Sequence, residues 1–384
     1  WQPVEYAGYD PLPITDLKVH MLSEPDSDKR DGLLRVITEG GIEGWSNGID
    51  AETARLITTQ FRAHLCDRDA LARERLWHDL VMLERLTWPP KKLRGAIDVA
   101  LWDILGQSVD LPVYQLLGGK CRDRIRVFNN VSGNTLADLA TSAVQNVENG
   151  FTSLRASPFF PGWESQPSTQ VISTAVEIVR TIRQAVGDEI DLGLEIHRNL
   201  APDAAIILAN ELAPFKILYY EDPLAPQSVE ALDYVARHVH IPIATGERFY
   251  NIQQFKDLID RKTVSLIRPD VSLAGGITQC KKIAALAEAS FIGIFPHLMG
   301  SPVNIAAFAQ LDASIPNYVL MESNIGADTF NEIVIQPLER DAGYLVVPDR
   351  PGIGVEIDES KLEKFPYKPS QISGNFGADG AVIH

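Results

Sequence analysis

The segment Asp191-Leu-Gly-Leu-Glu195 and four similar runs after it decide the fold. Each run is short and apolar, and an acidic residue or a histidine closes it; these closing residues recur at intervals of 23 to 27 residues. Such an interval holds one strand and one helix. In a parallel barrel the C-terminal strand ends meet at one mouth, where catalytic groups gather. The closing residues are Glu195, Glu221, Glu247, Asp270 and His297.

Outward from this segment, the chain from Arg126 onward alternates between strand-like and helix-like patterns. The clearest amphipathic helices are predicted over Gln170–Ala185 and Ile277–Ala289. A dinucleotide-binding sheet is excluded because Ser132-Gly133-Asn134, not a Gly-x-Gly-x-x-Gly motif, follows the first strand. Eight strands with helical connections predict a closed parallel α/β barrel. The strands are expected near 126–131, 152–156, 191–195, 216–221, 242–246, 264–268, 291–296 and 317–322.

The first part of the chain predicts a separate α+β domain. Residues 12–48 have the pattern of an antiparallel sheet with a turn at Gly40-Gly41, and the polar stretch Ser23–Asp31 predicts a mobile loop. Helical periodicity follows over 51–86, broken near Asp67, and Pro89-Pro90 is expected to start another helix.

After Glu322 the chain becomes extended and turn-rich, and we expect the segment from Gly343 to Gly354 to return to the first domain. The predicted division is therefore 1–124 for a capping domain, 125–325 for the barrel and 326–384 for a returning segment.

Composition sets broad limits on function. A length of 384 residues suits a barrel plus an accessory domain. The formal charge of −16 argues against nucleic acid or an anionic membrane as a partner, but not against a small anionic substrate. The three cysteines are widely spaced and odd in number, which favours buried thiols over disulfides or a zinc knuckle. No apolar run reaches the ~18 residues of a membrane span. We expect a cytoplasmic protein, although a cleaved segment before Trp1 stays open.

Carboxylates on successive strand ends indicate a metal site. They cannot all stay ionised in one cleft without a cation, because like charges raise one another's pKa. An all-oxygen ligand set suits Mg²⁺ better than zinc. The predicted metal ligands are Glu195, Glu221 and Glu247.

Two histidines and two more carboxylates are candidate catalytic groups. His197 lies two residues after Glu195, so strand alternation would place both on one side of the chain. His297 and Asp270 end neighbouring strands, where the carboxylate can orient the imidazole and raise its basicity. Glu322 ends the eighth strand, where it can contact substrate oxygens or be merely a polar strand end.

Proton abstraction beside a carboxylate needs these groups together. The resulting enediolate carries two charged oxygens, which Mg²⁺ stabilises as a Lewis acid. His297 would be the base. His197 would protonate a hydroxyl that leaves the adjacent carbon, so that water is eliminated. The predicted enzyme is therefore a dehydratase, that is, a hydro-lyase, which is a carbon–oxygen lyase.

At these residues the sequence resembles the enolase superfamily, in its mandelate racemase-like branch, and there the acid-sugar dehydratases. The resemblance implies that the substrate is a sugar acid, an aldonate or an aldarate, and that the product is a 2-keto-3-deoxy acid. The resemblance implies a (β/α)7β barrel under a capping domain built from both chain ends. It also implies Mg²⁺ on Glu195, Glu221 and Glu247, with His297 and Asp270 as a dyad; we further expect a homo-oligomer. Six segments carry the resemblance: 94–106, Tyr220-Glu-Asp-Pro, Gly246-Glu, Arg268-Pro-Asp, Ala274-Gly-Gly-Ile-Thr and Val347-Pro-Asp-Arg-Pro-Gly-Ile-Gly.

Two positions depart from that branch. Glu195 stands where Asp is usual, one methylene longer, and Leu154-Arg-Ala-Ser-Pro replaces the frequent Lys-x-Lys of racemases. Because Arg155 stays protonated at neutral pH, it is a poor general base, which disfavours racemisation by two bases.

Three alternatives stay open. The first is a hydroxy-acid racemase or epimerase with His197 as second base, and the second is a catalytically silent sugar-acid-binding protein. A zinc hydrolase fits less well, since the first strand lacks His-x-His. Substrate specificity is expected from the Ser23–Asp31 loop, the 44–50 region around Trp45 and the loop Phe159–Trp163.

Overall fold

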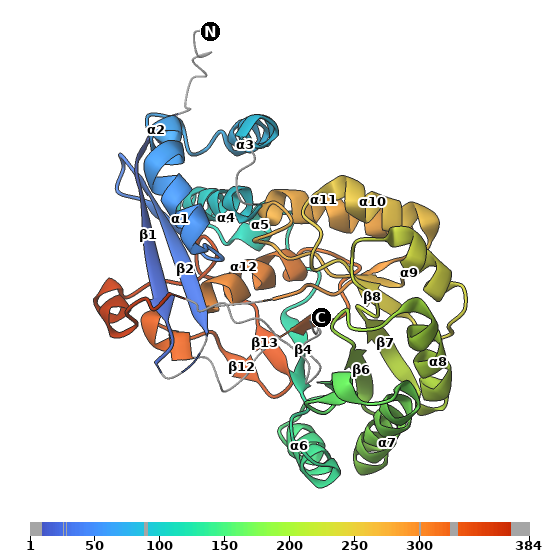
Figure 1. Cartoon of the computed structure of the whole chain (residues 1–384). Helices are drawn as coiled ribbons and strands as arrows, with labels where there is room; N and C mark the ends of the chain where they lie inside the picture. Colours follow the sequence, from blue (N-terminus) through green and yellow to red (C-terminus); the bar gives the residue numbers. More distant parts are fainter. Residues whose placement is uncertain are drawn as a thin grey trace.

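The structure of the protein is a computed structural model that describes residues 10–25, 27, 29–87, 91–298, 301–322 and 329–369; within these ranges the side chains of 85–87 and 329 are not described. Figure 1 shows a small sheet with its helices beside a larger strand-and-helix assembly. The predicted residues Pro89 and Pro90 lie outside the described ranges.

The N-terminal sheet is antiparallel, as predicted. Thr38 N–H donates to the Ile42 carbonyl at 3.1 Å and Gly41 has φ 76°, which closes the predicted turn. The predicted loop Ser23–Asp31 is too long, because Ser23 ends one strand and Arg30 and Asp31 begin the next. The strands, paired in the order β1-β2-β3, are β1 (Ile14–Ser23), β2 (Arg30–Thr38) and β3 (Glu43–Ser46).

Helices cover this sheet and join it to the barrel. The predicted break in the helical region is confirmed at Asp67, which has φ 64°. Glycine permits the close contacts of α4: a Cβ on Gly44 would lie 2.0 Å from the Ala100 carbonyl oxygen, and a Cβ on Gly95 would lie 2.1 Å from that of Ser272. The elements are α1 (Ala51–Leu56), η1 (Ile57–Phe61), α2 (Arg62–Leu65), α3 (Arg73–Thr87), α4 (Lys92–Ser108) and α5 (Val113–Leu116).

The larger unit has the predicted (β/α)7β succession. Strands pair in parallel from β4 through β10, and β11 pairs with the other side of β4. Within the described ranges, β10 and the segment that leads into β11 are joined by an isolated bridge between Ile294 and Tyr318, so a full strand ladder does not close the barrel there. The strands are β4 (Arg124–Asn130), β5 (Ser153–Ala156), β6 (Asp191–Glu195), β7 (Ile217–Glu221), β8 (Ile243–Thr245), β9 (Leu266–Ile267), β10 (Gly293–Ile294) and β11 (Met321–Glu322).

One helix follows each strand from β4 to β10 and covers the outside of the barrel (Figure 1). The two helices predicted most clearly, α7 and α11, are confirmed. The helices are α6 (Leu136–Glu148), α7 (Ser168–Val186), α8 (Pro202–Leu212), α9 (Val229–Ala236), α10 (Ile252–Arg261), α11 (Gly276–Glu288) and α12 (Pro302–Ala313). Short 3-10 turns lie at η2 (Trp163–Ser165) and η3 (Ala213–Phe215).

The C-terminal segment contacts both units. It contains η4 (Thr329–Ile333), β12 (Arg340–Asp341), β13 (Tyr344–Val346) and η5 (Glu359–Lys364). Its 344–346 part pairs with barrel strand β4. The expected return to the first part of the chain follows in the same segment, where Gly352 N–H donates to the Leu111 carbonyl at 3.0 Å and Ile353 N–H to Asp103 Oδ1 at 2.9 Å. The first sheet itself is reached later, where Ser23 N–H donates to the Phe365 carbonyl at 3.2 Å. The division at 124 and 325 stays a prediction.

Aromatic side chains fill the barrel interior. Phe128, Tyr219 and Phe295 are buried together, and a Cβ on Gly193 would lie 2.0 Å from Cζ of Tyr219. The barrel is therefore a packed core, and polar groups have room only at its ends.

The three cysteines differ in how far they are buried. Cys280 is buried as expected, whereas Cys121 is exposed and Cys66 half-buried, so the prediction of buried thiols was wrong for Cys121.

No helix in the described part of the chain combines the length and apolar character that crossing a bilayer requires.

Candidate active site

A cavity of about 380 Å³ opens at the C-terminal ends of the barrel strands. Residues from both units line it, since the lining includes Gly48 and Lys92 of the N-terminal unit beside the barrel residues. Most of the predicted site residues are among its lining: Glu195, His197, Glu247, Asp270, His297 and Glu322. Glu221 is completely buried beside them.

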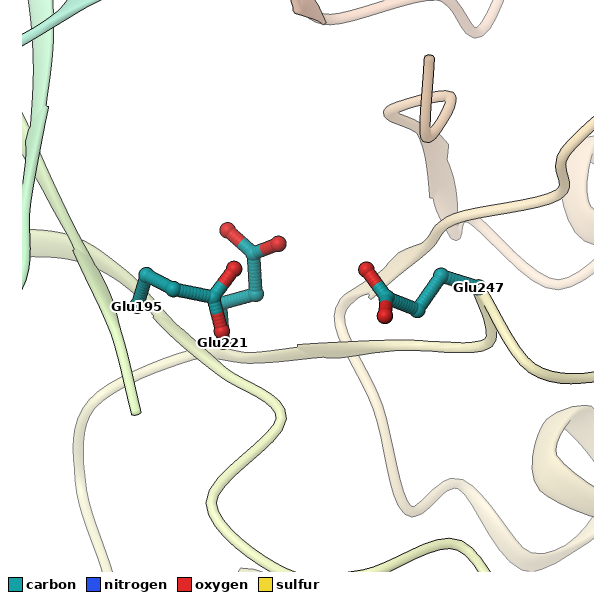
Figure 2. Close-up of side chains that lie close together, drawn as sticks. All are labelled: Glu195, Glu221 and Glu247. Carbon is teal, nitrogen blue, oxygen red and sulfur yellow. The ribbon is translucent and has the colours of Figure 1, made fainter. Parts of the chain in front are cut away.

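The three predicted metal ligands converge. Glu195 and Glu221 are paired end residues of β6 and β7, and Glu247 follows β8 by two residues. One carboxylate oxygen from each lies within 4.8 Å of the others. Figure 2 shows Glu247 pointing toward Glu195 and Glu221 from the opposite side. The arrangement brings together three buried oxygen donors, as a hard divalent cation requires; their role as ligands stays a prediction.

Arginines occupy the spaces between these carboxylates. Arg155 Nη1 lies 3.3 Å from Glu195 Oε2 and 3.3 Å from Glu221 Oε1. Arg198 donates to Glu247 and, at 3.0 Å, to Asp222 Oδ2. Both guanidinium groups are largely buried, so they partly neutralise the acidic cluster without screening by water.

Negative charge is nevertheless in excess at the cluster. Burial and the neighbouring charge of Glu221 raise the pKa of Glu195 well above its usual range. Burial, followed by the charges of Glu247 and Glu221, raises the pKa of Asp222 to about 6. A cation between the carboxylates would relieve this repulsion and return both pKa values toward normal. The residues therefore fit a metal ion.

His297 and Asp270 form the predicted pair. Asp270 Oδ2 lies 2.8 Å from His297 Nδ1, and the other ring nitrogen, Nε2, lies 3.5 Å from Glu247 Oε2. Burial lowers the pKa of His297, but the hydrogen bond and charge of Asp270, with the charge of Glu247, outweigh burial and raise that pKa. The carboxylate also fixes the tautomer, leaving Nε2 toward the cavity as the nitrogen able to take a proton.

His197 lies in the same cavity, but strand alternation does not explain its position. β6 ends at Glu195, and His197 and Arg198 have φ 59° and 68°. The His197 N–H donates to Glu195 Oε1 at 2.7 Å, which holds the Glu195 carboxylate back toward its own backbone. Burial and the positive charge of Arg198 lower the pKa of His197, so its imidazole is mostly neutral at pH 7.

Glu322 is firmly ionised. Its oxygens lie 2.7 Å from Arg155 Nη2 and 3.2 Å from Arg268 Nη2. Burial raises the pKa of Glu322, but Arg155 and Arg268 more than compensate and lower it to about 2. The carboxylate lines the cavity, so it is available as an acceptor for a substrate hydroxyl while its charge is balanced from behind.

Several site residues were not identified from the sequence. Arg268 is completely buried and places Nε 2.9 Å from Glu221 Oε1. Arg198 is three residues after the predicted ligand Glu195, and Arg268 is two residues before Asp270. This nearness to the predicted strand ends was the signal in the sequence that could have identified both arginines as site residues. The further lining residues are Gly48, Lys92, Arg248, Ser272 and Leu273.

The expected specificity regions are only partly at this cavity. Gly48 of the 44–50 region lines it. Trp45 instead lines a separate cavity of about 510 Å³ against the C-terminal segment. Phe159 and Trp163 stack with ring centroids 4.5 Å apart and line a third cavity of about 130 Å³. The Ser23–Asp31 stretch contributes no residue to the lining of the site cavity among its described members.

The barrel carries buried carboxylates and a His–Asp pair at its mouth. Two family models match the chain: mandelate racemase/muconate lactonizing enzyme, N-terminal domain, over residues 17–118, and enolase C-terminal domain-like over residues 138–361. The chain therefore belongs to the mandelate racemase/muconate lactonizing enzyme family of the enolase superfamily.

Individual relatives are similar over nearly the full length. A D-galactonate dehydratase of Variovorax paradoxus (strain S110) is 32% identical over 345 residues, 86% of this chain and 89% of the relative. The D-galactonate dehydratase of Ralstonia pickettii (strain 12J) is 32% identical over 343 residues, which cover 85% of this chain and 89% of the relative. A crystal structure of an enolase from Agrobacterium radiobacter, a candidate galactarate dehydratase with Na and L-malate bound, has a TM-score of 0.88 and 28% identity, covering 96% of this chain and 99% of that one.

Proposed function

We propose that the protein is a Mg²⁺-dependent sugar-acid dehydratase, a hydro-lyase that converts an aldonate or aldarate to a 2-keto-3-deoxy acid. One observation carries the proposal: the carboxylates Glu195 and Glu247, the pair His297–Asp270 and His197 all line one cavity, with Glu221 buried next to them. The dehydratase names of the full-length relatives support the same reaction class.

Glu195, Glu221 and Glu247 would hold the metal ion. Their oxygens meet within 4.8 Å, all three side chains are buried, and burial together with the charge of Glu221 raises the pKa of Glu195. When bound, Mg²⁺ supplies Lewis-acid stabilisation of the charge that develops on the substrate carboxylate. Arg155 remains beside two of these ligands and adds a fixed positive charge.

His297 would remove the proton from the carbon beside the carboxylate. Its Nε2 is the free nitrogen of the Asp270 pair, and the pKa raised by Asp270 makes it a stronger base. Asp270 keeps the imidazolium charge stabilised after transfer. The proton therefore ends on Nε2, and the electron pair left on carbon moves toward the carboxylate.

His197 would return a proton to the leaving hydroxyl. Burial and the charge of Arg198 lower its pKa and leave the resting imidazole mostly neutral, so solvent would supply the proton before His197 passes it to the oxygen that is becoming hydroxide. The division into base and acid is argued from position: His297 is oriented by Asp270, and His197 lies in the same cavity. The C–O bond breaks, water leaves, and the enol product becomes the 2-keto acid.

Racemisation by two bases is the second candidate, and Arg155 counts against it. Burial lowers the pKa of Arg155, but the charges of Glu322 and Glu221 raise it well above the ordinary value. Arg155 therefore cannot take a proton near neutral pH. A racemase would need His197 as second base.

A screen of aldonic and aldaric acids tests the proposal. The enzyme should form 2-keto-3-deoxy products with Mg²⁺ and none with EDTA. In solvent deuterium, exchange of the α-hydrogen with return of the starting acid would instead indicate an epimerase. Binding of acids without any exchange or product across the panel would indicate a silent sugar-acid-binding protein and reject the dehydratase.

A further inference from the structure

Asp31 is a buried carboxylate that the proposed reaction does not use. It lies in β2, is 6% exposed, and accepts hydrogen bonds on both oxygens. Oδ1 accepts from the Gly32 N–H at 2.9 Å, and Oδ2 accepts from Asn47 Nδ2 and from the Ser301 N–H, each at 3.1 Å. A carboxylate only accepts hydrogen bonds, so it suits a buried point where several N–H groups meet. Asp31 therefore fixes the segments that supply these donors.

Two of these donors belong to segments that border the site cavity. Asn47 directly precedes Gly48, which lines the cavity and whose N–H also donates to Asp31 Oδ1 at 3.4 Å. Ser301, immediately before α12, lies four residues after His297, the proposed base. One carboxylate of the N-terminal unit thus joins part of the cavity lining to the barrel segment that carries His297.

The segment that carries His297 is also attached within the barrel. His297 Nδ1 lies 2.8 Å from Asp270 Oδ2, and the Leu298 N–H donates to Glu322 Oε2 at 3.5 Å. Both carboxylates line the site cavity, where they would meet the substrate. The bond from this segment to Asp31 is buried behind the lining, so it can hold the segment whether or not substrate is bound.

The lining segment that Asp31 holds lies against the residues that follow Asp270. Gly48 is so close to Ser272 that a Cβ on Gly48 would lie 2.5 Å from Ser272 Oγ. Ser272 is two residues after Asp270 and lines the cavity. Asp31 is therefore bonded to the segment of His297 and, through Gly48, packed against the segment of Asp270.

We propose that Asp31 is a positioning residue for proton abstraction. By holding the Ser301 N–H it fixes the segment that carries His297, and so keeps Nε2 where it can reach the hydrogen beside the substrate carboxylate. A displacement of about 1 Å at a reacting group can cost about 10²-fold in rate. Asp31 is not part of the cavity lining, so it acts through these segments. The inference rests on the proposed function, because it assigns a role in the same reaction.

Two variants break the attachment from opposite sides. Asp31→Asn keeps the size of the side chain but turns one acceptor into an NH2 group that faces N–H donors. Ser301→Pro removes the N–H and leaves the carboxylate in place; Ser301 has φ −80°, which proline adopts. This second variant keeps a test available if Asp31→Asn does not fold. Asp103→Asn is the matched control, because Asp103 is 1% exposed and likewise accepts backbone N–H bonds, from Trp45 and Ile353.

The holoenzyme with Mg²⁺ is measured in two ways. kcat and KM are determined for a sugar acid that the parent protein turns over, and hydrogen–deuterium exchange is followed in the peptide from His297 to Asn304. Both variants should lower kcat by about tenfold to hundredfold and change KM less than about threefold, because the metal ligands are untouched. The backbone amides of this peptide should exchange about tenfold faster. Asp103→Asn should match the parent protein in kcat, in KM and in the exchange of this peptide.

Unchanged exchange of the peptide in both variants would overturn the inference, as would an equal fall of kcat in Asp103→Asn. A rise in KM with kcat unchanged would also overturn it, because Asp31 would then serve substrate binding. If the parent protein forms no product from any acid, the proposed function fails. The exchange of the peptide then still decides whether Asp31 holds this segment.

Discussion

Asp270 Oδ2 lies 2.8 Å from Nδ1 of His297, while Nε2 of the same ring faces Glu247 Oε2 at 3.5 Å. The imidazole is therefore held between the orienting carboxylate and the cluster of Glu195, Glu221 and Glu247. This relationship places the proposed base, His297, next to the carboxylates that are expected to hold the metal ion.

His297→Asn should abolish dehydration and leave metal binding intact. The amide cannot accept the α-proton, whereas none of the three carboxylates is removed. We expect a fall in kcat of about 10²–10⁴, the usual contribution of a general base. Coupled detection of the 2-keto acid measures kcat, and calorimetric titration measures Mg²⁺ affinity. Unchanged turnover would reject His297 as the base.

His197→Asn should separate the two halves of the reaction. His297 remains able to remove the α-proton, so exchange of that hydrogen with solvent deuterium should persist while water elimination fails. Mass spectrometry of the recovered acid gives the exchange, and product detection gives the elimination. Equal loss of both would remove the support for a separate acid role.

Arg155→Gln should destabilise the protein more without Mg²⁺ than with it. Removing one partner of a buried charge network costs about 3–5 kcal/mol, and Glu195, Glu221 and Glu322 all lose a contact. A bound cation replaces part of that charge at Glu195 and Glu221. Thermal unfolding with EDTA and with Mg²⁺ measures the difference, with Arg237→Gln on an exposed helix face as control. If Arg155→Gln lowers Tm equally with Mg²⁺ and with EDTA, the idea that Arg155 and the metal ion share Glu195 and Glu221 would be contradicted.

Asp103 should make stability depend on pH between about 4 and 6. Its oxygens accept 2.9 Å hydrogen bonds from the N–H groups of Trp45 and Ile353, and burial raises its pKa to about 6 in spite of them. The native state therefore holds the proton more tightly than the unfolded chain. Protonated Asp103 therefore adds at most about 3 kcal/mol to the free energy of unfolding. This contribution is complete below pH 4 and is lost as pH rises through 6.

Asp103→Asn should remove the part of the pH dependence of the free energy of unfolding that comes from Asp103. Calorimetric unfolding of both proteins from pH 4 to 7 isolates it, because Asp98 and Asp222, with pKa values also raised to about 6, are common to both. The free energy of unfolding of the parent protein minus that of Asp103→Asn should fall as pH rises. A difference independent of pH would show that Asp103 titrates alike in the folded and unfolded states.

The recurring strand ends were readable from the sequence because a parallel barrel repeats with the period of its βα unit. Glu195, Glu221, Glu247 and the pair Asp270–His297 followed from that period alone. The eight strands and seven helices followed for the same reason.

What the sequence did not reveal depends on contacts between distant segments. Arg155 reaches Glu322 across 167 residues, which no spacing rule encodes. Lys92 lines the cavity from α4, and that helix approaches Ser272 so closely that a Cβ on Gly95 would lie 2.1 Å from the Ser272 carbonyl oxygen. His197 was placed correctly in the cavity but by an argument that fails, since the strand stops at Glu195 and the next turn takes positive φ.

The central claim is that Glu195, Glu221 and Glu247 cage one divalent ion beside His297. A crystal structure grown with Mn²⁺ in place of Mg²⁺, using the anomalous signal of the metal, tests it most directly. We expect one strong anomalous peak, from an ion bound by an oxygen of each of the three carboxylates, and we expect this peak to be lost in Glu221→Gln crystals. A peak elsewhere in the protein, with the common centre of these carboxylates empty, would contradict it.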